Sequence, residues 1–312
     1  MNSFRRHFIK ILILLLCSSL TCGSAFAQNK SLRILLIGNS FSQNASTYLP
    51  ELTKEGGYEL TIGHAEIGGC SLQKHWELAE LNRLEPDNPN GKPYKGGNSL
   101  RMLLADGKWD VVSMQQFSYL SGDVGTYKPY INYLYDLVKS MQPDAKIVMH
   151  QTWAYRSDSK SFGRIASDKR AESEDVMYEK SREAYHTIAR ELNIPVIPTG
   201  DAFWLVGKDS QWRYKKDEKF NFLSATYPAL PNQINSLHAG YKWDSDKKLV
   251  VDTHHANDAG KYLGGLVWYS FLFNESAKTV KFKPETVSEE FAAQLKREAD
   301  EAIAGKLLPA NN

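Results

Sequence analysis

The sequence predicts a doubly wound α/β domain built on a mainly parallel sheet. Short apolar runs alternate with longer stretches of helical periodicity, as in successive βαβ units. Several of the runs are unbroken aliphatic segments, which is typical of strands that helices cover on both faces. Polar residues follow directly after these runs, where the carboxyl ends of parallel strands would meet and where such domains bind ligands.

Each element is expected from a local pattern. Five apolar runs predict strands, and stretches of 3.6-residue periodicity between them predict helices. Residues 85–98 are rich in Pro, Gly and Asn and predict a surface loop, whereas residues 209–248 predict an irregular, aromatic-rich excursion rather than a second domain. The expected strands are residues 33–37, 60–66, 109–114, 146–150 and 195–198, and the expected helices are residues 45–55, 71–83, 127–141, 170–192, 258–273 and 287–304.

The first 27 residues have the pattern of a signal peptide. Three basic residues precede the apolar run at 11–16, and the Ala-Phe-Ala sequence at 25–27 offers small residues for cleavage before Gln28. We therefore expect residues 28–312 to form one exported domain, either periplasmic or secreted. A lipoprotein anchor at Cys22 fits less well, because Ser-Leu-Thr before it is a poor lipobox.

Charge and cysteine content narrow the class of partner. Without the leader the chain has 35 basic and 36 acidic residues, a net charge of −1, and no run of Lys or Arg. This balance argues against nucleic acid as a partner and favours a small-molecule or glycan substrate. No later run is long enough to span a bilayer, so no stable membrane insertion is expected. Cys70 would be the one remaining cysteine, which leaves no internal disulfide.

Two motifs carry residues suited to catalysis. "GNSFS" at 38–42 delivers Ser40 to the end of the first predicted strand, and "DTHHANDAG" at 252–260 precedes a predicted helix. A carboxylate three residues before a histidine, on a turn leading into a helix, can hold one ring nitrogen. Asp252 would thus orient His255, and the other nitrogen would be free to accept a proton from a hydroxyl.

The two motifs together resemble the SGNH (GDSL-like) hydrolase superfamily, and an exported bacterial subgroup of it in particular. The resemblance implies a three-layer α/β/α sandwich with a mainly parallel central sheet, of the SGNH/flavodoxin-like kind. It also implies that Ser40 is the nucleophile, His255 the base and Asp252 its acid partner, with no metal or organic cofactor. Order and separation along the chain match the family as well.

The resemblance further implies an oxyanion hole. Its donors would be the backbone N–H groups of Ser40 and Gly69, with Gly68 as the alternative glycine in "EIGGCSL" at 66–72. The third family block, Gly-x-Asn, is missing from "DVVSMQQFS" at 110–118. We expect the amide of Gln116 to replace that asparagine, and Gln115 stays open as the alternative.

The same residues allow other interpretations. Ser40 alone could be a helix cap, although Ser42 is the better candidate for the cap. His254 could be the base, but its offset from Asp252 is two residues rather than three. Asp252 could also cap the next helix.

A metal site is a further alternative. Asp252, His254 and His255, together with His150, could ligate zinc, although no metal-binding spacing such as HExxH supports this. Aromatic residues on loops after the strands can also stack on sugar rings, and we expect this substrate-binding role for Trp153, Tyr155 and Trp204.

The sequence therefore predicts an exported serine esterase that hydrolyses acyl esters, with O-acetyl groups on a carbohydrate as the expected substrate. One alternative is a lipid or thioester acylhydrolase of the same fold. Another is a glycan-binding protein whose catalytic site has decayed, since the third block is missing. The distance between Ser40 and His255 in the folded protein distinguishes an intact catalytic site from a decayed one.

Overall fold

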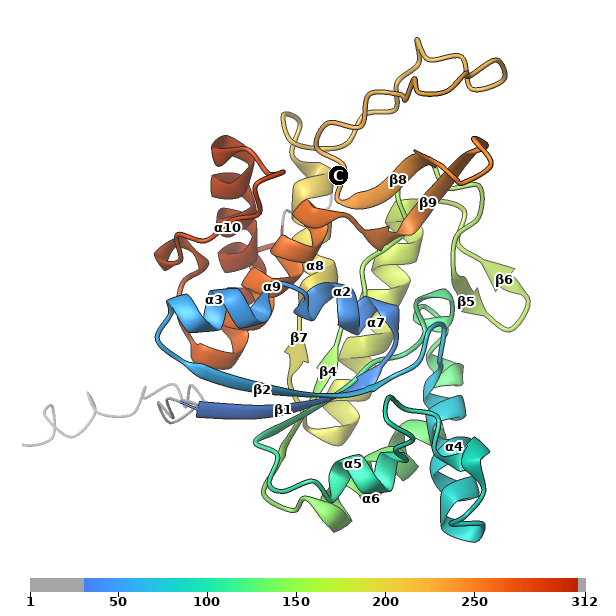
Figure 1. The fold of residues 1–312 in the computed structure, drawn as a ribbon, viewed down its shortest axis with the longest axis vertical. Helices are drawn as coiled ribbons and strands as arrows, with labels where there is room; N and C mark the ends of the chain where they lie inside the picture. Colours follow the sequence, from blue (N-terminus) through green and yellow to red (C-terminus); the bar gives the residue numbers. More distant parts are fainter. Residues whose placement is uncertain (1–30, 308–312) are drawn as a thin grey trace, which may run out of the picture.

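A five-stranded parallel sheet forms the centre of the computed structural model, which describes residues 31–307 (Figure 1). The strand order is β2-β1-β3-β4-β7, and every neighbouring pair is parallel. This is the flavodoxin-like doubly wound order, whose direction reverses between β1 and β3. The predicted fold class and all five predicted strands are confirmed. The strands are β1 (Ser31–Gly38), β2 (Glu59–Glu66), β3 (Val111–Met114), β4 (Lys146–His150) and β7 (Val196–Ile197).

Helices cover both faces of the sheet and make the three-layer sandwich (Figure 1). One face carries α2 (Ser40–Ser46), α3 (Leu49–Glu55), α8 (Thr199–Lys208), α9 (Asp258–Phe273) and α10 (Glu289–Ile303). The other face carries α4 (Leu72–Leu84), α5 (Leu100–Leu104), α6 (Tyr130–Met141) and most of α7 (Glu174–Leu192).

The unbroken aliphatic run of β1 follows from this arrangement. Ile34 and Leu36 face the first core, while Leu35 and Ile37 face the second, and all four side chains are fully buried. Successive side chains of a strand point to opposite faces, so a strand covered on both faces needs an apolar residue at every position. The sequence pattern around "ILLIGNS" thus indicates the central strand of the sheet.

The expected helix at 45–55 is two helices, and the first begins earlier than predicted, at Ser40. The side chain of Asn39 accepts a hydrogen bond from the N–H of Phe41, so the helix is capped directly after β1. Pro50 lies in the first turn of α3 and has no N–H to continue the ladder of α2. The chain therefore bends between the two helices.

The excursion at 209–248 and its neighbours contain structure that the sequence did not predict. An antiparallel hairpin of β8 (His238–Trp243) and β9 (Leu249–Ala256) ends it, and α8 precedes it. Residues 209–237 between them hold no helix or strand, and part of this stretch extends away from the body of the molecule (Figure 1).

The remaining short elements lie in the connections. The expected helix at 170–192 begins at Glu174, because Ser173 caps it and a small hairpin precedes it. The predicted loop at 85–98 has one short 3-10 turn and one isolated antiparallel bridge between Tyr94 and Asn98, and is otherwise turns and irregular chain. These elements are β5 (Arg164–Ala166), β6 (Lys169–Arg170) and the 3-10 helices η1 (Pro89–Gly91), η2 (Ser118–Leu120), η3 (Val124–Thr126) and η4 (Ala277–Thr279).

The predicted signal peptide at 1–27 and the alternative anchor at Cys22 lie outside the described residues and stay predictions. Within residues 31–307, no helix combines the length and the apolar character needed to cross a membrane.

Candidate active site

Ser40 lies at the carboxyl end of β1, where the direction of strand winding reverses. It is the first residue of α2 and is half-buried, so its side chain reaches the rim of the sheet. Gly38 just before it is closely packed, because an added Cβ would lie 2.9 Å from Oε1 of Gln115 and still closer to Oγ of Ser42. The glycine of the first motif is therefore required by a close approach of side chains to the backbone.

A buried hydrogen-bond network braces the turn that carries Ser40. Ser42 does not cap the helix as predicted. Its hydroxyl lies inside α2 and donates to Oε1 of Gln115 at 2.6 Å. The Gln115 amide donates to Oδ1 of Asn39 at 2.9 Å, and Asn39 donates in turn to the carbonyl of Cys70 at 3.0 Å. Asn39, which stands where the family has aspartate, thus caps the helix and ties it to the loop after β2.

A second support comes from α4. Nε2 of His75 donates to the carbonyl oxygen of Gly38 at 2.9 Å, and Nδ1 lies 2.8 Å from the hydroxyl of Tyr94. Burial lowers the pKa of His75 to about 4, so the ring is neutral at physiological pH. The ring therefore carries its proton on Nε2, and Nδ1 accepts a hydrogen bond from the hydroxyl of Tyr94. The sequence analysis missed this support.

His255 is carried by a β-bulge rather than by the predicted turn. In the β8–β9 ladder His238 pairs with Ala256 and Gly240 pairs with Asp252, so one residue of β8 faces the three residues 253–255 of β9. Bulges redirect side chains and are frequent beside active sites.

Three side chains satisfy the backbone groups that the bulge frees, and two of them come from distant parts of the chain. Oδ1 of Asp252 accepts the N–H groups of His254 and His255, each at 3.0 Å. Nε1 of Trp153 donates to the carbonyl of His254 at 2.9 Å, and Oδ1 of Asn44 accepts the N–H of Ala256 at 2.8 Å. These bonds fix the peptides on both sides of His255.

Asn44 joins the two halves of the site. It follows Ser40 by one helical turn on α2, and through Ala256 it holds this helix against the strand that carries His255. The sequence analysis did not single it out, although its spacing of four from Ser40 places both on one helix face.

The structure brings Ser40, His255 and Asp252 into one hydrogen-bonded line. Nε2 of His255 lies 2.9 Å from Oγ of Ser40, and Nδ1 lies 2.8 Å from Oδ2 of Asp252. Because Nδ1 donates to the carboxylate, Nε2 is left to accept a proton from the serine hydroxyl. The ring of His254 makes no such hydrogen bond to Ser40 or to Asp252. Its ring lies against Tyr155, with the ring centroids 3.9 Å apart, so it is not placed to act as the base.

The electrostatics of the pair follow from these contacts. Burial raises the pKa of Asp252, but hydrogen bonds from the ring and backbone of His255 and from the backbone of His254 outweigh burial and hold this pKa well below its usual range. The hydrogen bond to Asp252 raises the pKa of His255, although burial opposes it. The carboxylate is therefore ionised and stabilises the imidazolium that forms when His255 accepts a proton.

The loop after β2, which carries Gly69, lies against the turn that holds Ser40. It is held there because Ile67 donates to the carbonyl of Gly38 and Cys70 accepts from Asn39. Gly69 in this loop is exposed and has a φ of 65°, which favours glycine. In residues 31–307 the N–H groups of Gly69 and Ser40 have no acceptor, as the predicted oxyanion hole requires.

The expected role of Gln116 in the oxyanion hole is wrong. Its amide nitrogen donates to the carbonyl and hydroxyl of Thr126 at 3.0 and 3.1 Å, so both amide hydrogens are engaged. Its oxygen accepts the N–H groups of Leu72 and Phe117. Gln115 is engaged as well, since its amide bonds Asn39 and the carbonyl of Gln116. Both glutamines brace loops rather than donate to an oxyanion, and the sequence alone does not distinguish these two roles.

Replacing Gln116 with alanine should therefore lower stability and leave the chemistry largely intact. The variant would leave the N–H groups of Leu72 and Phe117 unpaired, and each such loss costs about 1–3 kcal/mol. Urea unfolding and ester hydrolysis measured on the folded variant check this, with the exposed Gln73→Ala as the matched control. A loss of 100-fold or more in rate at unchanged stability would restore the oxyanion role.

Two of the three aromatic residues expected to bind substrate are buried instead. Trp153 is 1% exposed and lies between the rings of Phe41 and Phe203, with centroids 4.3 and 4.5 Å away. Tyr155 is 5% exposed, and its hydroxyl lies 3.2 Å from that of Ser118. Both therefore support the site from beneath. Trp204 lines a separate pocket, described below.

The alternative metal cluster is not assembled. His150 is fully buried against Trp268, with ring centroids 5.1 Å apart, and it does not join Asp252 and its neighbours. Across residues 31–307, no three His, Cys, Asp or Glu side chains form a group that could hold a metal ion.

The central sheet is parallel, with the strand order β2-β1-β3-β4-β7. A serine follows its first strand and lies beside a histidine that an aspartate orients. Together these features define an SGNH-like (GDSL-like) hydrolase fold. Residues 33–221 match the family model called "Domain of unknown function (DUF4886)", and the chain belongs to this family. Asp252 and His255 lie beyond the matched segment.

A solved structure from the same family shares the fold of this chain. A DUF4886 family protein from Bacteroides uniformis ATCC 8492 is 25% identical with a TM-score of 0.68, covering 89% of this chain and 97% of that one. An acetyl xylan esterase, AlAXEase, is 13% identical with a TM-score of 0.46, covering 77% and 100%. A lipase/acylhydrolase from Enterococcus faecalis is 14% identical with a TM-score of 0.41, covering 78% and 96%. At such low sequence identities and TM-scores, the last two structures say nothing about the substrate of this chain. No curated protein matches the chain.

Proposed function

We propose that the protein is a serine ester hydrolase with Ser40 as nucleophile, His255 as general base and Asp252 as its orienting carboxylate. The observation that carries this proposal is the unbroken line of two short hydrogen bonds from Asp252 through His255 to Ser40. A 2.9 Å contact between residues 215 positions apart also favours an intact site over a decayed one.

The reaction would proceed by acyl transfer in two steps. Oγ of Ser40 attacks the ester carbonyl carbon while Nε2 of His255 takes the hydroxyl proton. The N–H groups of Ser40 and Gly69 would hold the oxyanion. When the tetrahedral intermediate collapses, the bond to the alcohol breaks and the imidazolium returns its proton to the leaving oxygen. Water, deprotonated by His255, then attacks the acyl carbon and releases the acid and free Ser40.

The openness of the site favours an ester carried on a bulky alcohol. The side chains of His255 and Asp252 are 44% and 28% exposed, and Gly69 lies at the surface. A polymer surface can approach such a site, whereas a long acyl chain would need an apolar channel to bury it. Short acyl esters of a carbohydrate, with acetyl first, are therefore the proposed substrates. Export with loss of residues 1–27 belongs to the same proposal and is supported by the leader sequence.

Covalent labelling and a chain-length series test the proposal. A fluorophosphonate should label the purified protein at Ser40, and mass spectrometry of the peptide that holds it identifies the site. p-Nitrophenyl acetate should be cleaved with a higher kcat/KM than the octanoate, and acetylated glycans should release acetate. Absence of labelling would refute the nucleophile. A preference for chains of eight carbons or more would replace the carbohydrate substrate with a lipid or thioester.

A further inference from the structure

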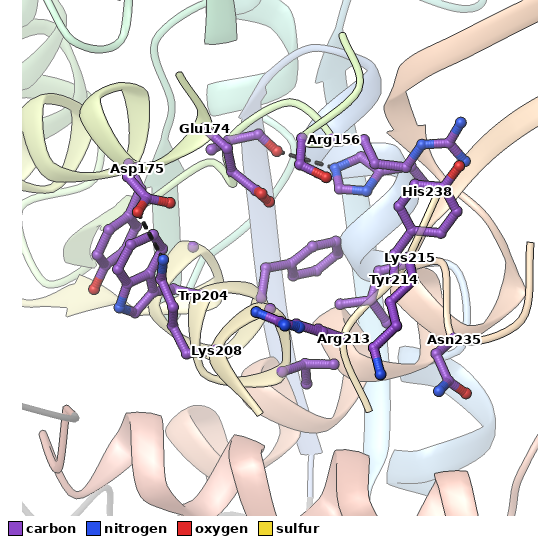
Figure 2. Close-up of a pocket in the computed structure, with 18 residues that line it drawn as sticks. Arg156, Glu174, Asp175, Trp204, Lys208, Arg213, Tyr214, Lys215, Asn235 and His238 are labelled. Carbon is purple, nitrogen blue, oxygen red and sulfur yellow. Dashed lines mark hydrogen bonds and ion pairs between the residues drawn. The ribbon is translucent and has the colours of Figure 1, made fainter. Parts of the chain in front are cut away.

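A pocket of about 320 Å³ lies between the start of α7, the helix α8 and the segment that follows α8 (Figure 2). It is separate from the proposed active site. Phe203 lines the pocket and stacks on Trp153, which stacks in turn on Phe41 beside Ser40. These rings form a wall between the two sites, so the pocket calls for a ligand of its own.

Two of the cations around the pocket are already compensated. Arg156 is 1% exposed and makes a bidentate pair with Asp158, with distances of 2.6 and 3.0 Å. Lys208 binds Asp175 at 2.7 Å. These pairs shape the walls and leave little charge for a ligand.

Three charged side chains around the pocket make no close polar contact, although Lys208 and Arg156 interact with Glu174 at longer range. In the part of the chain that the structure describes, Arg213, Lys215 and Glu174 make no side-chain hydrogen bond and no ion pair. Figure 2 shows the Glu174 carboxyl and the Arg213 guanidinium on opposite sides of the pocket, with no interaction joining them. Arg213 and Lys215 are exposed and free of ion pairs in the described residues, so a ligand there would meet two cations and one carboxyl, which favours a ligand that carries an anionic group.

Glu174 adds a second requirement. Burial raises the pKa of Glu174 to about 7, because the cavity wall withholds water from its carboxyl. A carboxyl in this setting is stabilised by hydroxyl groups, which donate to its charged form and accept from its neutral form. The ligand should therefore present hydroxyls on the side away from its anionic group.

The rest of the wall is apolar. Phe203, Val206 and Leu237 line the pocket with hydrocarbon, and each is buried. The faces of Trp204 are occupied, one by Tyr178 and one by Lys208, so the pocket offers hydrocarbon edges rather than an open ring for stacking. Such a wall suits the C–H groups of a saturated ring.

We propose that this pocket binds a sugar acid, a saccharide unit that carries a carboxylate. Its carboxylate would lie at Arg213 and Lys215, its hydroxyls would face Glu174, and its ring would contact Phe203 and Leu237. Arg213 and Lys215 come from the excursion after α8, which gives part of that segment a function. The binding is independent of ester hydrolysis, because the pocket shares no residue with the proposed catalytic line.

The test is a calorimetric titration of the full chain carrying Ser40→Ala. This variant lacks the proposed nucleophile, so the binding result does not depend on whether the catalytic proposal is right. The probes are the methyl glycosides of glucuronic acid and of glucose. The glucuronide should bind about tenfold or more tightly than the glucoside, since a hydrogen bond between charged groups is worth at least that factor. Equal binding of the two probes, or acetate or inorganic phosphate binding as tightly as the glucuronide, would overturn the proposal.

Variants locate the site. Arg213→Gln and Lys215→Gln should each reduce the preference for the glucuronide, whereas Lys216→Gln, the neighbouring lysine outside the pocket, should leave it unchanged. Glu174→Gln should weaken both probes, and thermal unfolding shows whether each variant is folded. If Arg213→Gln and Lys215→Gln keep the full preference while folded, the sugar acid binds elsewhere and the assignment of this pocket is wrong.

Discussion

Ser40→Ala is expected to abolish ester hydrolysis while the fold is kept. Removing a triad nucleophile lowers kcat by about 10⁴- to 10⁶-fold, because the remaining groups bind substrate but cannot form the acyl-enzyme. The Ser40 hydroxyl has His255 as its hydrogen-bond partner and lies at the first position of α2, so its loss should change stability by no more than about 0.5 kcal/mol. Measuring kcat/KM on p-nitrophenyl acetate together with thermal unfolding separates the two effects.

Ser42 provides the matched control, since it lies in the same motif but has a structural role rather than a catalytic one. Its hydroxyl is buried and donates to Gln115. Ser42→Ala should lower the free energy of unfolding by about 1–3 kcal/mol, because it leaves the Gln115 oxygen unpaired. Its activity should fall far less than that of Ser40→Ala. Activity retained in Ser40→Ala and lost in Ser42→Ala would transfer the nucleophile to Ser42.

The parts of the fold that the sequence predicted are those with strong local signals. The aliphatic run at 34–37 in β1 is typical of a strand covered on both faces, and the turn at Gly38 and Asn39 marked its carboxyl end. Parallel strands bring their carboxyl ends to one edge, so placing Ser40 there required no knowledge of distant contacts. The offset of three residues from Asp252, as in the family motif, then indicated which histidine would meet it.

The elements and roles that were missed depend on tertiary contacts. β9 reads "LVVDTHHA", and its bulge breaks the alternation that would have marked a strand. The hydrogen bonds of Gln116 go to Thr126 and Leu72, which are remote enough that spacing gives no indication of them. Trp153 is aromatic and follows a strand, as a sugar-binding residue would, yet stacking between two phenylalanines decides its role.

Asp252→Asn is expected to lower kcat by about 10⁴-fold, as the loss of the orienting carboxylate does in serine triads. The geometry gives the reason. Oδ1 of Asp252 accepts two backbone N–H groups of the bulge, and the side-chain oxygen of asparagine would keep those bonds. Its NH₂ group would then donate to Nδ1 of His255. The ring proton would move to Nε2, which faces Ser40 and could no longer accept from it.

The pH profile distinguishes this effect from a loss of structure. The hydrogen bond that His255 donates to Asp252 raises the pKa of His255 above its ordinary value of about 6.5. Because His255 must be neutral to accept the serine proton, kcat/KM should rise with pH through this raised pKa. Asp252→Asn removes the negative charge and the hydrogen bond that His255 donates to it, while burial still lowers the pKa of His255. The acid limb of the pH profile should therefore move to lower pH. Asp258→Asn, which changes the next carboxylate along the chain, should leave the limb in place. If the limb of Asp252→Asn coincides with that of the wild type, Asp252 does not set the protonation of His255.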